Sequence, residues 1–376
     1  MEGTIQNAAR EIVGRRDFTI VLIMLMHLKF FAQNVLGMDF LVLDMVLVAL
    51  MLFCIDYRRI RYSFFILIPW AAVSVINPGA RGMLLIFLIT YIVSELPLRA
   101  ILWYNLVSQA LVFCIVSILL LLGVTESVMF DQTAWDARIR YDFSMGNPNT
   151  FALFIYSFLI NLYLYAGLRN RPVMWAILAV TLLVSKYTGS RTFMIAMALL
   201  FVVHIFRNMW KNHPKLSRTI LLTMPAIMLS AVIYISLNYT DFPVINLLFT
   251  GRFRLYNMLM TTVSPMQTLV GVPDVNTMVI DNSFIHMLYE GGIIPVGVFF
   301  YLYYTAMIHS DGNDLSIMMP LLVSVFMVGL TENILTFALL FGNMIVWVIL
   351  YKIYMGESIS EMLEPEYEED SGVSSL

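Results

Sequence analysis

Residues 100–123, AILWYNLVSQALVFCIVSILLLLG, form an apolar run without a charged side chain. A helix of this length is long enough to cross the ~30 Å hydrocarbon core of a bilayer. Similar runs recur along almost the whole chain of 376 residues, of which 60% are hydrophobic and 12% are charged. Soluble domains carry about twice that density of charge. The sequence therefore predicts an integral membrane protein.

The apolar runs indicate about twelve membrane crossings. A backbone that crosses lipid must satisfy its own hydrogen bonds, so each run is expected to be a helix. We predict an all-α, polytopic fold with a single transmembrane domain over residues 1–356. The tail over 357–376 has seven acidic residues and no basic ones, which predicts an acidic, disordered, cytoplasmic segment. The predicted helices cover residues 18–36, 39–55, 62–76, 83–95, 100–123, 148–167, 172–187, 191–207, 219–237, 288–308, 316–331 and 334–352.

The distribution of Lys and Arg predicts the orientation. The loops on the side of the N-terminus hold 14 of the 22 basic residues, and the loops on the other side hold seven. Because cytoplasmic loops are enriched in basic residues, both termini are expected in the cytoplasm. The first apolar run follows Arg10, Arg15 and Arg16 and is interpreted as a signal anchor. The two cysteines lie inside apolar runs, so neither a disulfide framework nor a metal site is expected.

Two of the predicted outer loops are long, at residues 124–147 and 238–287. Long loops are usually functional or disordered. These two are rich in Trp, Tyr, Phe and Asn, which favours an ordered structure. In the second loop, Phe253 and Tyr256 belong to an apolar pattern of helical spacing, which predicts a short amphipathic helix around 252–262.

Arginines on the predicted outer side run against the positive-inside bias. Arg191 follows Gly189-Ser190, and Arg252 and Arg254 follow Gly251; Arg138 and Arg140 lie in the other long loop. Guanidinium groups suit bidentate binding of phosphate oxygens. The alternative is that these side chains reach the phosphates of lipid headgroups. Two separate sites, each behind a glycine, favour a functional role.

A second group of polar residues, DNSFIHMLYEGG at 281–292, lies where the long loop re-enters the membrane. His286 and Glu290 are i,i+4 neighbours on a helix, so the carboxylate could orient the imidazole or act as a base. An equally weighted alternative is a helix start with Asp281 or Ser283 as its N-cap. Asn282 would lie on the same helix face as His286.

Further polar residues are candidates at three places in the chain. Asn147 and Asn149 flank Pro148 at a predicted helix start, where a structural cap is favoured over ligand binding. His27 and Lys29 lie within the first predicted helix, where polar residues are by default functional hypotheses. Glu332, at the turn before the last predicted helix, is interpreted as a cap.

Taken together, these motifs resemble the O-antigen polymerase and ligase family. The resemblance rests on Gly189-Ser190-Arg191, on Gly251-Arg252, on Asp281-Asn282-Ser283-Phe284 with Gly291 or Gly292, and on the helix opening Gly146-Asn147-Pro148-Asn149. It covers about residues 140–300. Family members often have Trp shortly after Gly-Arg, where this chain has Tyr256.

The resemblance implies a glycosyltransferase of the bacterial cytoplasmic membrane that acts on undecaprenyl-diphosphate-linked oligosaccharides at the outer face. Arg191 and Arg252 would bind the diphosphate of the donor, without a cofactor or a metal. Ligases of the family show His-Asn where this chain has Asp281-Asn282, which favours a polysaccharide polymerase for capsule or O-antigen synthesis. The base stays open between Asp281, His286 and Glu290.

Two alternatives remain: a glycan ligase of the same family, and a transporter or flippase of lipid-linked sugar. Membrane lipids, a chain-length regulator and a flippase are further candidate partners. The net charge of −3 gives no basic footprint for nucleic acid. The chain has no P-loop, so nucleotide hydrolysis is not expected.

Overall fold

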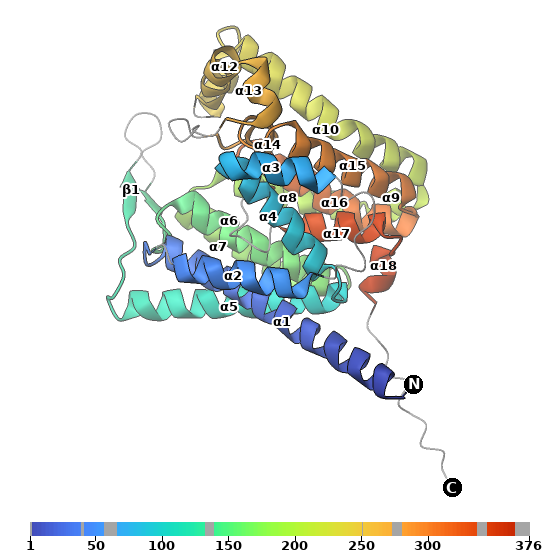
Figure 1. Cartoon of the computed structure of the whole chain (residues 1–376). Coiled ribbons are helices and arrows are strands. Elements are labelled where there is room, and N and C mark those ends of the chain that lie inside the picture. The colour runs from blue at the N-terminus through green and yellow to red at the C-terminus, as the bar shows by residue number, and fades with distance from the viewer. Residues whose placement is uncertain are drawn as a thin grey trace.

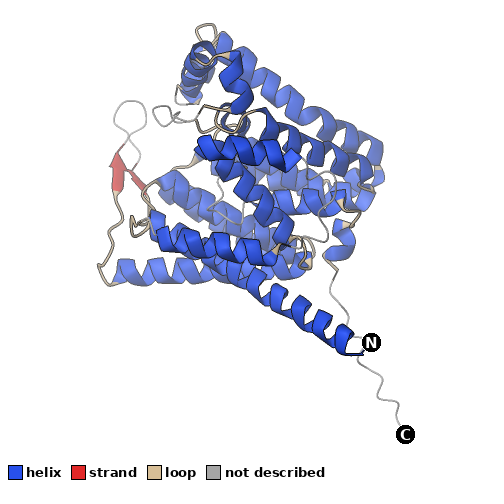
Figure 2. Cartoon of the chain, in the orientation of Figure 1, coloured by secondary structure: helices blue, strands red, loops and turns tan. Residues whose placement is uncertain are grey.

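The computed structural model describes residues 2–38, 41–55, 66–131, 139–249, 251–272, 280–336 and 344–364. It is a bundle of helices with one small two-stranded sheet in the described part of the chain (Figures 1 and 2). The helices up to the middle of the chain are α1 (Glu2–Asn34), α2 (Leu41–Cys54), α3 (Leu67–Ile76), α4 (Pro78–Val93), α5 (Leu98–Leu121), α6 (Pro148–Leu162) with the π-helical turn η3 (Tyr163–Gly167), α7 (Arg171–Thr188) and α8 (Arg191–Ile205).

The second half of the chain is also helical. Its elements are α9 (Arg207–Asn212), α10 (Pro214–Leu237), α11 (Pro243–Leu248), α12 (Arg252–Thr262), α13 (Pro265–Val270), α14 (Ser283–Tyr289), α15 (Ile293–His309), α16 (Gly312–Gly329), α17 (Ile345–Tyr354) and α18 (Ile359–Met362). The predicted amphipathic helix around 252–262 is confirmed as α12.

Among the described residues, four helices are long and apolar enough to cross a membrane: α5, α6 continued by η3, α10 and α16. Several shorter apolar helices of 10–17 residues accompany them. Each of the twelve predicted runs overlaps a helix, although the run at 288–308 is broken before α15 and the run at 334–352 meets α17 only from Ile345. The all-α expectation is therefore confirmed, whereas the number of twelve crossings stays a prediction. Parts of the predicted helices at 39–55, 62–76 and 334–352, most of the tail and Arg138 lie outside the described residues.

The centre of the bundle is formed by α6 and α16. Of the apolar stretch in each helix that could cross a membrane, 72% is buried inside the protein in α6 with η3 and 78% in α16. The corresponding buried shares are 33% in α5 and 22% in α10. α16 packs against α8, α9 and α10, and α1 packs against α2 and α5. Since the exposed residues of α5 and α10 include many large apolar side chains, their outward faces suit contact with lipid.

Basic side chains close the helix ends at the end of the bundle where α1 begins and α18 lies (Figure 1). Arg218 on α10 donates to the carbonyl oxygens of Met307 (3.1 Å) and Ser310 (2.8 Å) at the end of α15. Arg207 donates to the carbonyl of Leu168, just after η3 (3.2 Å). The last carbonyls of a helix have no partner within it and carry partial negative charge, so these arginines stabilise the helix ends.

The long loops lie at the other end and are ordered over their described parts. In the first loop, strand β1 (Met129–Asp131) pairs with β2 (Ile139–Tyr141) in antiparallel register. In the second loop, α12 and α13 lie at the edge of the bundle (Figure 1). Asn77, the N-cap of α4, donates to the carbonyls of Val270 (3.0 Å) and Glu290 (2.8 Å), which ties the second loop to the bundle.

Candidate functional site

Four helix N-termini meet at the turn that follows α16, residues 330–332. The start of α6 reaches it through Asn149, whose amide donates to Glu332 (3.3 Å). The start of α8 reaches it through Thr192, whose hydroxyl bonds to that of Thr331 (2.8 Å). Each helix N-terminus carries about half a positive charge. The helix starts therefore bring partial positive charge close to a turn that carries the negative C-terminal end of α16.

The other two N-termini belong to α12 and α14. Arg252, the first residue of α12, bonds to the carbonyl of Thr331. At the start of α14, Asn282 donates to the carbonyl of Leu330 (3.0 Å), and the hydroxyl of Ser283 donates to the carbonyl of Glu332 (2.8 Å). Because the carbonyls after α16 are helix C-terminal acceptors, the polar side chains of neighbouring helix starts satisfy them.

Arg252 holds two carboxylates together. Its Nη2 lies 2.9 Å from Oδ2 of Asp281 and 3.3 Å from Oε1 of Glu332, and the three side chains are 10% to 25% exposed. Burial lowers the pKa of Arg252, but Glu332 and Asp281 outweigh this effect and raise it above its ordinary value. The guanidinium therefore stays charged, and its charge is balanced inside the protein.

Glu332 is the most perturbed acid of the group. Burial raises its pKa to about 7, against the opposing effect of Arg252 and with a further rise from the nearby charge of Asp281. Burial also raises the pKa of Asp281, against the attraction of Arg252. A carboxylate that titrates near neutral pH can accept and release a proton under working conditions. Such perturbed groups are typical of functional sites.

Arg140 and Asn149 extend the group from the sheet side. Arg140 of β2 donates through Nε to the carbonyl of Thr188 at the end of α7, and through Nη2 to Oδ1 of Asn149, both at 2.6 Å. Asn149 in turn bonds to Glu332. The residues Arg140, Asn149, Arg252, Asp281 and Glu332 thus form one connected network, which we call the turn cluster.

The predicted i,i+4 contact of His286 on α14 with Glu290, the C-cap of that helix, is confirmed, with Nε2 of the imidazole 2.9 Å from Oε2 of the carboxylate. The predicted cap needs a correction. Asn282, and neither Asp281 nor Ser283, is the N-cap, because its side chain accepts from the N–H groups of Phe284 and Ile285. Asp281 is thereby left to pair with Arg252.

The remaining predicted site residues differ in position. Tyr256 is buried beside Arg252, and burial raises the pKa of its hydroxyl. Arg191 and Arg254 are exposed, at the start of α8 and within α12. Asn147 is exposed and caps α6 by accepting from the N–H of Asn149 (2.8 Å). Arg252 and Asn149 are therefore integrated in the network, whereas Arg191 and Arg254 keep exposed side chains.

Glu332 and Arg140 are the residues that sequence reasoning undervalued. Glu332 was expected to be a helix cap, but its carboxylate instead joins two helix starts in the turn cluster. Arg140 stood out as a basic residue on the predicted outer side, without a partner that the sequence could assign. The signal that could have singled out Glu332 is an acidic residue between two strongly apolar helices.

Comparison of the chain with protein-family models, with curated proteins and with solved structures finds no match. The motif resemblance and the chemistry of the turn cluster are therefore the basis on which a function is proposed.

Proposed function

We propose that the protein is a polysaccharide polymerase of the bacterial cytoplasmic membrane that joins undecaprenyl-diphosphate-linked oligosaccharide repeats at the outer face. The observation that carries the proposal is the meeting of four helix N-termini and two arginines around a carboxylate with a pKa of about 7. Helix N-termini beside an arginine suit a diphosphate, and a base near neutral pH suits a sugar hydroxyl.

In the proposed reaction, a hydroxyl oxygen of the acceptor sugar attacks the anomeric carbon of the donor. The bond between that carbon and the diphosphate oxygen breaks, and the lipid diphosphate leaves with the electron pair. Glu332 receives the proton of the hydroxyl and later releases it to water. Fixed positive charge near the departing diphosphate stabilises the charge that develops there.

The exposed arginines are the best candidates for diphosphate binding. Arg191 begins α8, where the helix N-terminus adds positive potential beside the guanidinium. Arg252 is instead held by Asp281 and Glu332, so we assign it the role of positioning the base. The pair of His286 on α14 and Glu290 at its C-terminal end is a second candidate for proton transfer.

The test is a polymerisation assay with the full chain in proteoliposomes and lipid-linked repeat units extracted from its source strain. The wild type is expected to produce a ladder of longer lipid-linked glycans. Glu332→Gln should lose the ladder and Arg191→Ala should weaken it. The control is Lys186→Ala, which removes an exposed cation in the last turn of α7, five residues before Arg191, and it should keep the ladder.

Absence of a ladder with the wild type overturns the polymerase. Transfer of finished glycan to a different acceptor would instead identify a ligase. A ladder that persists in Glu332→Gln overturns the assignment of the base, and equal losses in Arg191→Ala and Lys186→Ala overturn the specific role of Arg191.

One observation favours the transporter as a second candidate. Between α5 and α6, Asn105 bonds to Asn161 (3.4 Å) and Gln109 bonds to Ser157 (2.9 Å), and all four side chains are buried within candidate membrane spans. Polar residues inside a membrane often mark a transport path, although they also hold helices together. The test is movement of labelled lipid-linked sugar across the membrane of vesicles that contain only this protein. Movement that Gln109→Leu abolishes would support transport over polymerisation.

A further inference from the structure

An exposed apolar surface lies where the end of α3, the short helix α13 and the start of α15 meet. Asn77, which follows α3, donates to the carbonyl of Val270 on α13 and to that of Glu290. Gly292, which precedes α15, lies so close to α13 that a Cβ there would come within 2.7 Å of the carbonyl oxygen of Leu269. The residues of this surface, which we call the lateral patch, are between 38% and 74% exposed: Val75, Ile76, Met266, Leu269, Val270 and Ile293.

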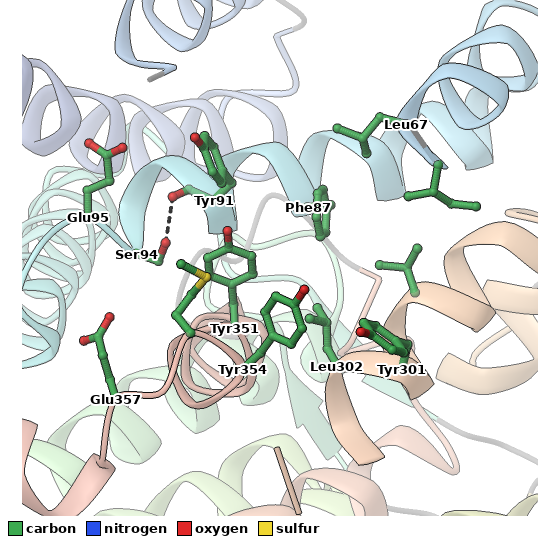
Figure 3. A pocket seen from close by; sticks show the side chains of 13 residues that line it. Leu67, Phe87, Tyr91, Ser94, Glu95, Tyr301, Leu302, Tyr351, Tyr354 and Glu357 are labelled. Atoms are coloured by element: carbon green, nitrogen blue, oxygen red, sulfur yellow. Dashed lines mark hydrogen bonds between the residues drawn. The ribbon is translucent and has the colours of Figure 1, made fainter. Parts of the chain in front are cut away.

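The lateral patch continues the exposed apolar faces of two helices. On α3, the exposed Ile68 lies seven residues before Val75 and therefore on the same face. On α15, the exposed Tyr301 lies eight residues after Ile293, on the same side of the helix. The two helices flank a cleft whose lining includes Leu67 of α3 and Tyr301 (Figure 3). In a helical membrane protein, such apolar faces contact acyl chains, and the patch extends this contact surface to α13.

An arginine marks the edge of the lateral patch. Arg81, in the first turn of α4, donates through Nε to the carbonyl of Ser74 (3.0 Å) and through Nη2 to that of Val75 (3.2 Å). It thereby satisfies the last carbonyls of α3, while its side chain stays exposed. An arginine of this kind places its apolar stem along apolar surface and its guanidinium at the level of the lipid headgroups.

The polar groups of α13 are satisfied within the protein. At its start, the N–H of Ser264 donates to Oε1 of Gln267 (2.9 Å), and the N–H of Gln267 donates to Oγ of Ser264 (3.3 Å). The hydroxyl of Thr268 donates to the carbonyl of Ser264 (3.2 Å). At its end, Asn77 donates to Val270. Lipid offers no hydrogen-bond partner, so a short helix among acyl chains needs this closure, whereas a helix in water can leave such groups to the solvent.

We propose that α13 is embedded in the bilayer, with the lateral patch in contact with the acyl chains of one leaflet. The distribution of Lys and Arg predicts that this is the outer leaflet. The segment 238–287, expected from the sequence to be an outer loop, then returns into the membrane at α13 before α14 begins. The proposal does not depend on the proposed glycosyl transfer.

The test measures the surroundings of single fluorescent labels on the full chain in phospholipid nanodiscs. Cys54→Ala and Cys114→Ala remove the native thiols, and a bimane label is attached to Leu269→Cys in the lateral patch. Leu111→Cys, exposed in the middle of the candidate span α5, is the control for lipid. Glu126→Cys, exposed in the other long loop, is the control for water. The quenchers are phospholipids with brominated acyl chains and, separately, iodide in the buffer.

The label at Leu269 should be quenched by brominated lipid as strongly as the label at Leu111. Its quenching constant for iodide should be about tenfold lower than that of the label at Glu126, because an ion does not enter hydrocarbon. A label at Val75→Cys should behave like the one at Leu269, which covers the case that a single label disturbs its own site. Each variant should elute normally on size exclusion.

Two results overturn the proposal. Iodide quenching at Leu269 as strong as at Glu126 would place α13 in water. Quenching by neither agent would mean that protein covers the lateral patch, either a second copy of the chain or another segment of the same one.

Discussion

Removing the charge of Arg252 should destabilise the protein in a way that depends on pH. In Arg252→Gln, the carboxylates of Asp281 and Glu332 lose the cation that lies 2.9 and 3.3 Å from them. Breaking a buried pair by removing one partner costs about 3–5 kcal/mol, because the other charge stays buried without compensation. We expect a loss of this size when both carboxylates are ionised.

The sign of the pH dependence follows from Glu332. Its pKa of about 7 in the folded protein lies above its ordinary value of 4.5, which corresponds to about 3 kcal/mol. The folded chain therefore binds this proton more tightly than the unfolded chain, and its contribution to stability falls as the pH rises from 4.5 to 7. Without Arg252 the pKa rises further, so the fall continues to higher pH.

The assay is thermal unfolding of the purified protein in detergent or nanodiscs between pH 5.5 and 9. The melting temperature of Arg252→Gln should lie below that of the wild type by less at pH 5.5, where Glu332 is protonated, than at pH 8 to 9, where Glu332 is ionised. Arg254→Gln is the matched control, because Arg254 is exposed on the same helix, and its substitution should have little effect. A deficit of Arg252→Gln that is the same at every pH would refute the coupling to Glu332.

Three further variants test other contacts of the fold and the site. Glu332→Gln should lower polymer formation about 10²- to 10⁴-fold and remove the fall in stability between pH 5 and 7, as read from glycan ladders and melting curves. Gly189→Ala should cost about 1–2 kcal/mol in thermal unfolding, because its φ is +61° and a Cβ would lie 3.2 Å from a neighbouring arginine side chain, whereas Gly82→Ala, with open space around it, should be neutral or stabilising. Asn77→Ala should cost about 2–3 kcal/mol in the same assay, because it leaves two helix-end carbonyls without donors, and Asn170→Ala, which removes one cap bond of 3.5 Å, should cost less.

Much of the fold follows from local patterns. The run at 100–123 became α5, and the helical spacing of Phe253 and Tyr256 became α12, since apolar periodicity and backbone hydrogen bonding act within one segment. Asn147 caps α6 as its place before a proline suggested. The break between α14 and α15 was less visible in the sequence, where the run at 288–308 was interpreted as a single helix. Gly292, with φ of +85°, separates the two helices.

The sequence by itself determined that this is a helical protein of membrane character, because hydrophobic runs need no partner to be recognised. It also marked Arg252 and Asp281 as unusual. Only the tertiary structure decided that Glu332 lies at the centre of the candidate site. Its carboxylate meets residues 183 and 80 positions away in the chain. Its pKa is raised by burial among them, and burial is a property of the packed helices rather than of any one segment.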